Sequence, residues 1–377
     1  MYHAISTLHG LEAVRKKPGM YIGGTDQRAL HDCVLELLAN SVEEHLAGRG
    51  SLIVVTLHED GSLSVSDEGG GITTDLDPER QAPFIEVALT TLHFPAGRLP
   101  KPFRTFGSLG VGPKCVNAVS EWMRVKTVWN GREHQIGFAR GCVQEPLRIS
   151  TQPVLARGTD IRFKPDSEIF QTTIFDRYSL ARTLDSLALL YPGLVLVLED
   201  RRPNAATRPL TSLYHYPDGI KDYLNRLPQG RAGWRYEPLV IEDEANGIRI
   251  KLGFRFTEIA NASILSFANS LPTVQGGAHE HGLLIGLADG FNALPESTSP
   301  LSASECRHGL HAFIAVWLDN PRFGGSTKDK LIKPEVEIAV RELTARGFKE
   351  WAATEGNHPK WLRESLIERR KSEADEN

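Results

Sequence analysis

The most informative stretch of this 377-residue sequence is Leu63-Ser64-Val65-Ser66-Asp67-Glu68-Gly69-Gly70-Gly71-Ile72. Its first half alternates apolar and small polar residues, which predicts a half-buried strand that ends at Asp67. Glycines two and four positions after Asp67 let the backbone approach a ligand closely, and a half-buried carboxylate can accept a hydrogen bond from an exocyclic amine. A plain turn after a strand has the same pattern, so this stretch alone leaves both interpretations open.

A long helix is predicted just before this stretch. Apolar residues recur at helical spacing over residues 30–46, and Glu36, Asn40 and Glu43 or Glu44 share one face of that helix. A carboxylate can accept a proton from an attacking water, and an amide oxygen is a ligand that suits Mg²⁺ beside phosphate oxygens. A solvated polar stripe would give the same spacing, so the helix alone does not decide between them.

A glycine run follows further along, at Gly107-Ser108-Leu109-Gly110-Val111-Gly112, and it opens a predicted helix over residues 113–120. Bare amides and the positive end of a helix dipole favour phosphate groups. The stretch 94–112 is too long for an ordinary connection and suggests a mobile lid. A lone glycine run is a weak signal, but here it follows the helix and strand motifs in order, and the three together predict a nucleotide site.

The remaining pattern predicts an α+β chain with two domains. Strands are expected at residues 51–58, 63–67, 124–129, 134–138, 159–163 and 194–199, and a further helix at 85–93. The segment 201–219 is polar and broken by Pro and Gly, as domain borders often are. We therefore expect domains at residues 1–217 and 218–359, followed by a charged helix or tail over 360–377.

In their order and spacing, the three motifs resemble the nucleotide site of the GHKL superfamily, which includes gyrase, MutL proteins, a chaperone family and histidine kinases. Residues 10–23, from Gly10-Leu11-Glu12 to Tyr21-Ile22-Gly23, are similar to the opening of bacterial gyrase and topoisomerase IV B subunits. Later segments agree, at residues 116–120, 158–159, 275–279 and 323–331. The resemblance implies a GHKL (Bergerat) ATPase sandwich followed by a ribosomal S5 domain 2-like transducer domain.

The resemblance also implies roles for individual residues in binding ATP and Mg²⁺. Glu36 would be the general base that activates water, and Asn40 would be the Mg²⁺ ligand. Asp67 would read adenine, with Thr159 helping at its edge, and Lys328 would reach the γ-phosphate from the second domain as a second catalytic residue. Further expected nucleotide contacts are Tyr21, Glu44, Gly69, Gly71, Ile72, Arg98, Arg104, Gly107, Leu109, Gly110, Val111 and Gly112.

The sequence departs from the family pattern at several places. The glycine run lacks the usual His, Gly70 stands where an Arg is usual, and Gln135 replaces an Arg of the aminocoumarin contact region. The transducer loop reads Ser326-Thr327-Lys328, where Gln-Thr-Lys is usual. The Glu-Gly-Asp-Ser signature of the metal-binding TOPRIM domain does not occur either. We therefore expect no DNA cleavage by this chain alone, and whether it is a fragment or a stand-alone protein stays open.

Composition sets limits on partners and location. The formal charge of −4 provides no global basic surface for nucleic acid, so any DNA contact is expected from a local patch or a partner. The four cysteines are scattered without metal-ligand spacing. No apolar run of about 18 residues and no signal peptide are present, so a cytoplasmic location without membrane contact is expected.

Two hypotheses about function follow. In the first, the chain is an ATP-operated clamp that forms a homodimer when ATP binds, captures DNA in its cavity and reopens after hydrolysis. It would work with other topoisomerase domains or with an A-type subunit. In the second, motivated by the departures at Gly70, Ser326 and the lid, the chain is a stand-alone regulator that binds a partner and uses the nucleotide as a switch.

Overall fold

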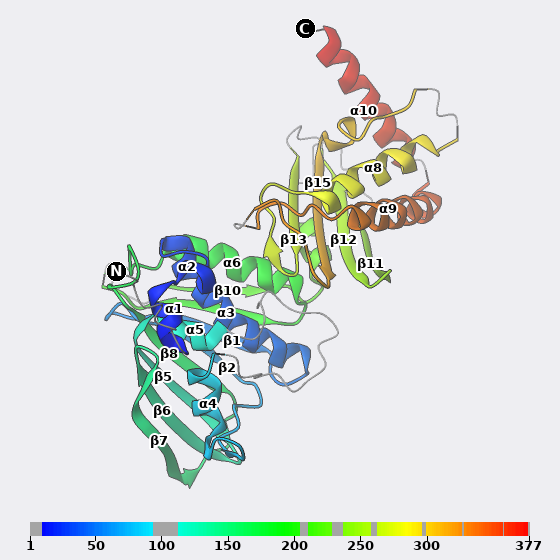
Figure 1. The fold of residues 1–377 in the computed structure, drawn as a ribbon. Coiled ribbons are helices and arrows are strands. Elements are labelled where there is room, and N and C mark those ends of the chain that lie inside the picture. The colour runs from blue at the N-terminus through cyan, green and yellow to red at the C-terminus, as the bar shows by residue number, and fades with distance from the viewer. Residues whose placement is uncertain are drawn as a thin grey trace, which may run out of the picture. The chain divides into compact units, whose positions relative to one another are not determined.

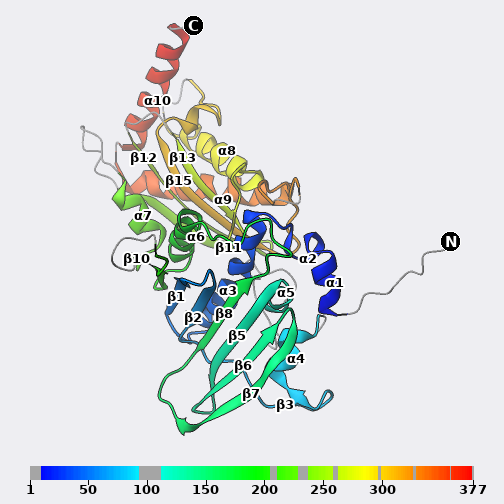
Figure 2. The same cartoon turned by 90° about the vertical axis from the view of Figure 1, so that its left-hand side faces the viewer.

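The computed structural model describes residues 10–92, 112–203, 210–227, 237–257, 262–295, 299–325, 328–356 and 358–375. The chain forms two compact units, Met1–Pro217 and Asp218–Asn377. Each unit is a β-sheet with helices packed against it (Figures 1 and 2). Within the described residues, every helix is too short or too polar to span a bilayer.

The first unit is built on an eight-stranded sheet with the order β10-β9-β1-β2-β8-β5-β6-β7. Only β1 and β9 pair in parallel among these strands, and their neighbours are antiparallel. The strands are β1 (Leu52–Leu57), β2 (Leu63–Asp67), β5 (Ser120–Trp129), β6 (Arg132–Ala139), β7 (Cys142–Pro153), β8 (Thr159–Pro165), β9 (Val195–Asp200) and β10 (Leu210–His215). A separate two-stranded ribbon pairs β3 (Leu76–Asp77) with β4 (Ala82–Pro83).

Helices cover one face of this sheet. They are α1 (Leu11–Lys16), α2 (Gly19–Ile22), α3 (Gln27–Leu46), α4 (Phe84–Thr90), α5 (Gly112–Ala118) and α6 (Arg177–Leu190). On β1, Ile53, Val55 and Leu57 are buried toward them, because alternate side chains of a strand point to opposite faces. Asp26 caps the N-terminus of helix α3, because its Oδ1 accepts a hydrogen bond of 2.9 Å from the Ala29 amide.

The sequence pattern predicted the central strands and missed the two edges. Residues 142–153 and 210–215 form β7 and β10, the outermost strands. The second of these lies within the polar segment that we interpreted as a domain border. Every residue of these two edge strands is exposed or half-buried, so neither carries the fully buried apolar residues that mark the central strands.

The second unit has a five-stranded sheet with the order β11-β12-β15-β13-β14. The strands are β11 (Leu239–Ala245), β12 (Ile248–Phe256), β13 (Ser263–Ala268), β14 (Leu271–Pro272) and β15 (Leu310–Leu318). The helices are α7 (Ile220–Arg226), α8 (Ala278–Asn292), the 3₁₀ turn η1 (Glu305–Arg307), α9 (Pro334–Thr354) and α10 (His358–Asp375). Helices α8 and α9 pack on each other, and Gly286 makes this possible because a Cβ atom there would lie 2.6 Å from the Arg341 carbonyl oxygen.

The last helix, α10, belongs to the core of the second unit. Leu362 and Leu366 lie one helical turn apart and are 1% and 3% exposed within the same apolar cluster as Phe254 and Trp351. The expected division at residue 360 therefore falls inside a helix that is packed on the unit. Because residues 360–377 are highly charged, the sequence pattern did not reveal that Leu362 and Leu366 attach this helix to the core.

Candidate functional site

Asp67 lies at the end of β2, where three strands bring polar groups together on the helix-covered face. Its neighbour across the antiparallel ladder is Thr159 on β8, and the neighbour of Thr159 on β5 is Thr127. The Thr159 amide donates to Asp67 Oδ1 at 3.3 Å, and the two threonine hydroxyls are 3.3 Å apart. The pairing thus places the predicted adenine reader and its predicted helper side by side.

Two further residues complete this cluster, and the sequence reasoning did not select them. Ser41 on α3 donates from Oγ to Asp67 Oδ2 at 2.7 Å, so the helix and the strand are joined at the carboxylate. Thr127 Oγ1 accepts the Ile72 amide at 2.7 Å, which holds the end of the glycine turn. Their positions in the sequence give at most a weak indication of a role in the site. Ser41 follows Asn40 directly, and Thr127 lies two residues after Val125, on the same buried face of β5.

The carboxylate of Asp67 is held in a polar but enclosed setting. Burial raises the pKa of Asp67, while hydrogen bonds from Ser41, Gly69 and Thr159 act in the opposite direction. The Gly69 amide donates to Oδ1 at 2.8 Å. A carboxylate with donors fixed around it has few orientations. Its remaining capacity to accept a hydrogen bond therefore has a defined direction, which suits a donor such as an amine.

The turn after Asp67 requires glycine at position 71. Gly71 has a φ of +79°, in the left-handed region that other residues rarely adopt. A Cβ atom there would also lie 2.1 Å from the Val128 carbonyl oxygen. The glycine turn therefore packs closely against β5, while the approach to a ligand that the sequence predicts stays a prediction.

Helix α3 contributes the predicted catalytic face. Glu36 is half-buried and Asn40 is exposed. The Glu36 carboxylate meets the first residue of α5, because a Cβ atom at Gly112 would lie 2.1 Å from Glu36 Oε2. The structure thus joins the helix motif to the last glycine of the glycine run. Glu44, one turn beyond Asn40, accepts the Gly70 amide at 2.7 Å.

The donor set around Asn40 suits Mg²⁺. A magnesium ion keeps several waters and takes substrate phosphate oxygens, so one amide oxygen on an exposed helix face, beside the Glu36 carboxylate, fits such an ion. A cluster of three or more His, Cys, Asp or Glu side chains is not found among the residues that the structure describes. The ion would therefore depend on water and on the phosphates of a bound nucleotide for most of its other ligands.

Lys114 is a buried cation that sequence reasoning overlooked. It lies in the first turns of α5, two residues after Gly112, and it is 1% exposed. Burial lowers the pKa of the Lys114 ammonium. No pattern marks it in the sequence, since a lysine near the start of a short helix is ordinarily a surface residue.

Several predicted site residues cannot be placed with this cluster. Arg98, Arg104, Gly107, Leu109, Gly110 and Val111 lie outside the described residues. Tyr21 is half-buried on α2. Lys328 belongs to the second unit, where its φ is +57° and its amide donates to the Gly325 carbonyl oxygen at 3.2 Å. A lysine with positive φ is uncommon.

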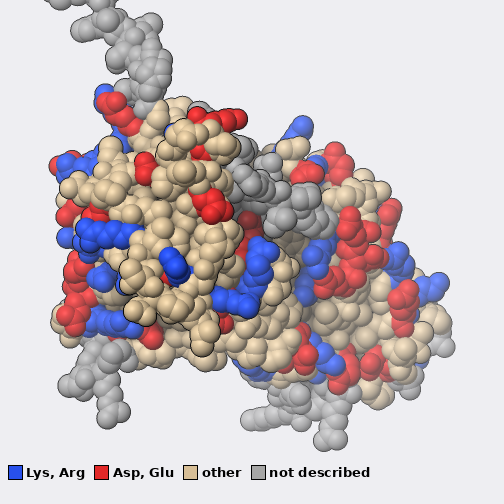
Figure 3. Space-filling model, turned by 90° about the horizontal axis from the view of Figure 1, so that it is seen from below, with Lys and Arg blue, Asp and Glu red and all other residues tan. Residues whose placement is uncertain are grey.

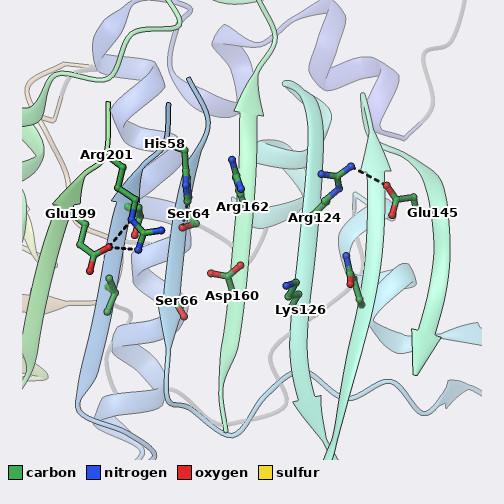
Figure 4. Close-up of a pocket in the computed structure, with 13 residues that line it drawn as sticks. His58, Ser64, Ser66, Arg124, Lys126, Glu145, Asp160, Arg162, Glu199 and Arg201 are labelled. Atoms are coloured by element: carbon green, nitrogen blue, oxygen red, sulfur yellow. Dashed lines mark hydrogen bonds and ion pairs between the residues drawn. The ribbon is translucent and has the colours of Figure 1, made fainter. Parts of the chain in front are cut away.

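A hollow of about 660 Å³ lies on the opposite, open face of the same sheet. Figure 4 shows its side chains rising from neighbouring strands, with ion pairs between Arg124 and Glu145 and between Arg201 and Glu199. Ser66 lines this hollow, while its neighbour Asp67 points to the helices. This hollow is therefore separate from the Asp67 cluster.

Gln135 lines the open-face hollow as well. The side chain that β6 directs to the Asp67 face is its neighbour His134, whose Nδ1 lies 2.8 Å from Thr74 Oγ1. Gln135 therefore does not face the candidate nucleotide site, which the sequence alone could not show because a shift of one residue exchanges the faces of a strand.

Comparisons with known families support both units. The family described as "Histidine kinase-, DNA gyrase B-, and HSP90-like ATPase" matches residues 25–169, and the family described as "DNA gyrase B" matches residues 219–377. The first match contains Glu36, Asp67 and Thr159. The second contains Lys328.

Individual relatives extend the match along most of the chain. The B subunit of DNA gyrase from Thermus thermophilus is 38% identical over 349 residues, covering 90% of this chain and 54% of the relative. The B subunit of DNA topoisomerase 4 from Staphylococcus epidermidis is 35% identical over 375 residues, covering 97% and 56%. The chain thus spans about half the length of these curated relatives.

A solved structure matches nearly all of both chains. The 43K ATPase domain of Thermus thermophilus gyrase B, determined in complex with an aminocoumarin, superposes with a TM-score of 0.81 at 33% sequence identity and covers 99% of each chain. The topoisomerase IV ATP-binding domain of Francisella tularensis superposes with a TM-score of 0.71 at 29% identity, with 96% of each chain covered.

Proposed function

This chain belongs to the GHKL ATPase regions of bacterial type IIA topoisomerase B subunits, and we propose that it binds and hydrolyses ATP as a dimer clamp. Its fold is the α+β GHKL (Bergerat) sandwich followed by a transducer domain. We assign the sandwich to residues 1–217 and the transducer to 218–359, with residues 360–377 as its C-terminal helix. The observation that carries the proposal is the Asp67 cluster with its donors from α3 and β8.

Adenine recognition is the first step that the geometry supports. Ser41, Gly69 and Thr159 donate to the two oxygens of Asp67. Each carboxylate oxygen has more than one lone pair, so Asp67 can still accept a hydrogen bond from the exocyclic amine of adenine. The threonine hydroxyl of Thr159, on the adjacent strand, offers a donor or an acceptor for the ring edge.

Hydrolysis follows from the position of Glu36. The attacking water would donate its proton to the Glu36 carboxylate while its oxygen bonds to the γ-phosphorus and the bond to the ADP oxygen breaks. Mg²⁺, when bound, neutralises phosphate charge, and Asn40 would hold it. The amides of residues 107–112 would surround the phosphates, with the Arg98 and Arg104 cations nearby, and Lys328 would supply a positive charge at the γ-phosphate in the ATP-bound state.

Dimerisation and DNA capture complete the proposed cycle. Two chains would associate through the N-terminal region that includes Tyr21, enclose DNA, and separate after hydrolysis. Basic and acidic side chains are interspersed on the face shown in Figure 3, so DNA would be held by local basic groups rather than by net charge. We propose a cytoplasmic location and an A-type topoisomerase subunit as the partner that cleaves DNA.

The departures from the family pattern favour one alternative. Gly70, Ser326 and the glycine run without His each alter a place where the family contacts nucleotide. A chain that binds ATP tightly and hydrolyses it very slowly would be a nucleotide-switched regulator. Such a protein would use the same fold to bind its partner.

The first experiment combines turnover with size. ATP hydrolysis by the purified chain is measured, and its mass in solution is determined with and without a non-hydrolysable ATP analogue. Turnover together with analogue-driven dimerisation supports the clamp. Tight binding without turnover supports the regulator, and a chain that stays monomeric with saturating analogue contradicts the clamp.

A further inference from the structure

The Arg49 side chain lies where the side chain of a larger residue at position 70 would extend. A Cβ atom at position 70 would lie 3.1 Å from Arg49 Cδ and 3.2 Å from Arg49 Nε. Gly70 does not have a positive φ in this structure, so its backbone conformation would admit another residue. The space there is narrowed by the side chains of Arg49 and Glu44 rather than by the backbone, and a larger residue would require the arginine to shift by a few tenths of an ångström.

The guanidinium of Arg49 is directed at Glu44. Arg49 Nε donates to Glu44 Oε2 and Nη2 donates to Oε1, both at 2.7 Å. The same Oε2 accepts the Gly70 amide at 2.7 Å. Burial raises the pKa of Glu44, but the hydrogen bonds from Arg49 and Gly70 outweigh it and leave that pKa below its usual value. A charged Glu44 therefore bridges Arg49 and the glycine turn.

The backbone after α3 is shaped to bring Arg49 to this place. The Arg49 amide donates to the Glu44 carbonyl oxygen at 2.9 Å, and Gly48 and Gly50 both have positive φ. A Cβ atom at Gly50 would lie 2.9 Å from the Glu68 carbonyl carbon and oxygen. Residues 48–50 therefore pack against the turn that starts at Asp67, in the position from which Arg49 can reach Glu44.

We propose that Arg49 is a positioning residue for nucleotide recognition, which supplies from the end of α3 the guanidinium that Gly70 does not carry. Through Glu44 it holds the Gly70 amide, and with it the turn that leads from Asp67 to Gly71. Asp67 is then presented to adenine in one orientation. This inference rests on the proposed ATP-binding function, and it gives the departure at Gly70 a physical compensation.

The expected effect is moderate. Two parallel hydrogen bonds from a guanidinium to a carboxylate are the strong form of this interaction, but the side chains are 42% and 26% exposed, and solvent weakens such pairs. We expect Arg49→Ala to raise the KM for ATP about 3- to 10-fold with kcat nearly unchanged, because Glu36 is untouched. Arg49→Lys should give a KM between those of the original chain and Arg49→Ala, since lysine keeps the charge without the planar guanidinium.

The decisive test is an exchange of positions. Gly70→Arg in the Arg49→Ala background should restore the KM to within about twofold of the original chain. Gly70→Arg alone should raise the KM, because two arginines then compete for one carboxylate in crowded space. Gly70→Arg would then lower the KM in the Arg49→Ala background and raise it in the original chain. Such a reversal shows that positions 49 and 70 are directly coupled. Arg201→Ala, which removes a similar arginine–glutamate pair on the open face, is the matched control and should leave the KM unchanged.

A second readout needs no nucleotide. Hydrogen exchange at the Gly70 amide should be several-fold faster in Arg49→Ala than in the original chain, and the double variant should restore it. The inference is overturned if the KM of Arg49→Ala stays within twofold, if Arg201→Ala raises it equally, or if Gly70→Arg fails to rescue. Failure of the original chain to bind ATP would refute the proposed function and the nucleotide part of this inference, while the exchange rates would still decide whether Arg49 holds the turn.

Discussion

The Ser41 hydroxyl on α3 donates a hydrogen bond of 2.7 Å to Asp67 Oδ2 at the end of β2. This contact joins the helix motif and the strand motif, two of the three sequence motifs on which the proposed nucleotide site depends. Because α3 also carries Glu36 and Asn40, one helix bears the proposed hydrolytic residues and contacts the proposed adenine reader through Ser41. Substitutions at these positions should therefore separate binding from turnover.

We expect Asp67→Asn to weaken binding of ATP and of its non-hydrolysable analogue about 10- to 100-fold, since it removes a charged acceptor worth roughly 1.5–3 kcal/mol. Titration calorimetry measures the change. Asp160→Asn is the matched control, because Asp160 lies on the same part of the sheet but lines the open face. Equal affinity in the Asp67 variant and the original chain would remove Asp67 from the site.

Glu36→Gln should abolish turnover while it preserves ATP affinity, because the amide keeps the shape of the side chain but cannot accept the proton of water. A general base contributes on the order of 10²- to 10⁴-fold to a rate. Steady-state hydrolysis and analogue binding are compared with those of Glu121→Gln, an exposed glutamate paired with Lys164. Turnover within twofold of the original chain would show that another group accepts the proton.

His279 should make the second unit sensitive to acid. Its ring is enclosed, Nε2 lies 3.0 Å from Thr273 Oγ1, and burial lowers the pKa of His279 to about 4. In the unfolded chain the pKa is near 6.5, so between pH 6.5 and 4 the unfolded chain binds a proton that the folded chain does not. The free energy of unfolding should therefore decrease as the pH is lowered from 6.5 to 4, by on the order of 1.4 kcal/mol per pH unit.

The pH effect is measured by urea unfolding at several pH values, with NMR titration of the imidazole as a direct check. His31, His58 and His311, whose pKa values burial also lowers, act in the same direction. His279→Gln should reduce the slope but not remove it. An imidazole of His279 that becomes protonated near pH 6.5 in the folded chain would contradict the prediction.

Leu362→Ala should destabilise the second unit by about 2–5 kcal/mol, because the side chain is 1% exposed in the core and its loss leaves a cavity. Denaturant unfolding checks this value. Trp361→Ala is the neighbouring control, and since Trp361 is 56% exposed, it should change the stability by no more than about 0.5 kcal/mol. Similar losses in both variants would indicate that α10 is held through its exposed face.

Local residue pattern was enough to predict those parts of the site that depend on backbone geometry. Helical spacing placed Glu36, Asn40 and Glu44 on one face of α3, and alternation followed by glycines placed Asp67 at the end of a strand with a tight turn after it. Both are consequences of backbone geometry within a few residues. The family resemblance then predicted the fold class of both units.

Which distant residues complete the site depends on how the helices and strands pack together. Ser41, Thr127 and Arg49 reach the Asp67 turn through contacts that depend on strand register and on where α3 ends. The outward direction of Gln135 and the attachment of α10 through Leu362 are decided in the same way. These contacts join residues far apart in the chain or across a turn, and their geometry is set by the packing of whole elements, which no local pattern of residue types records.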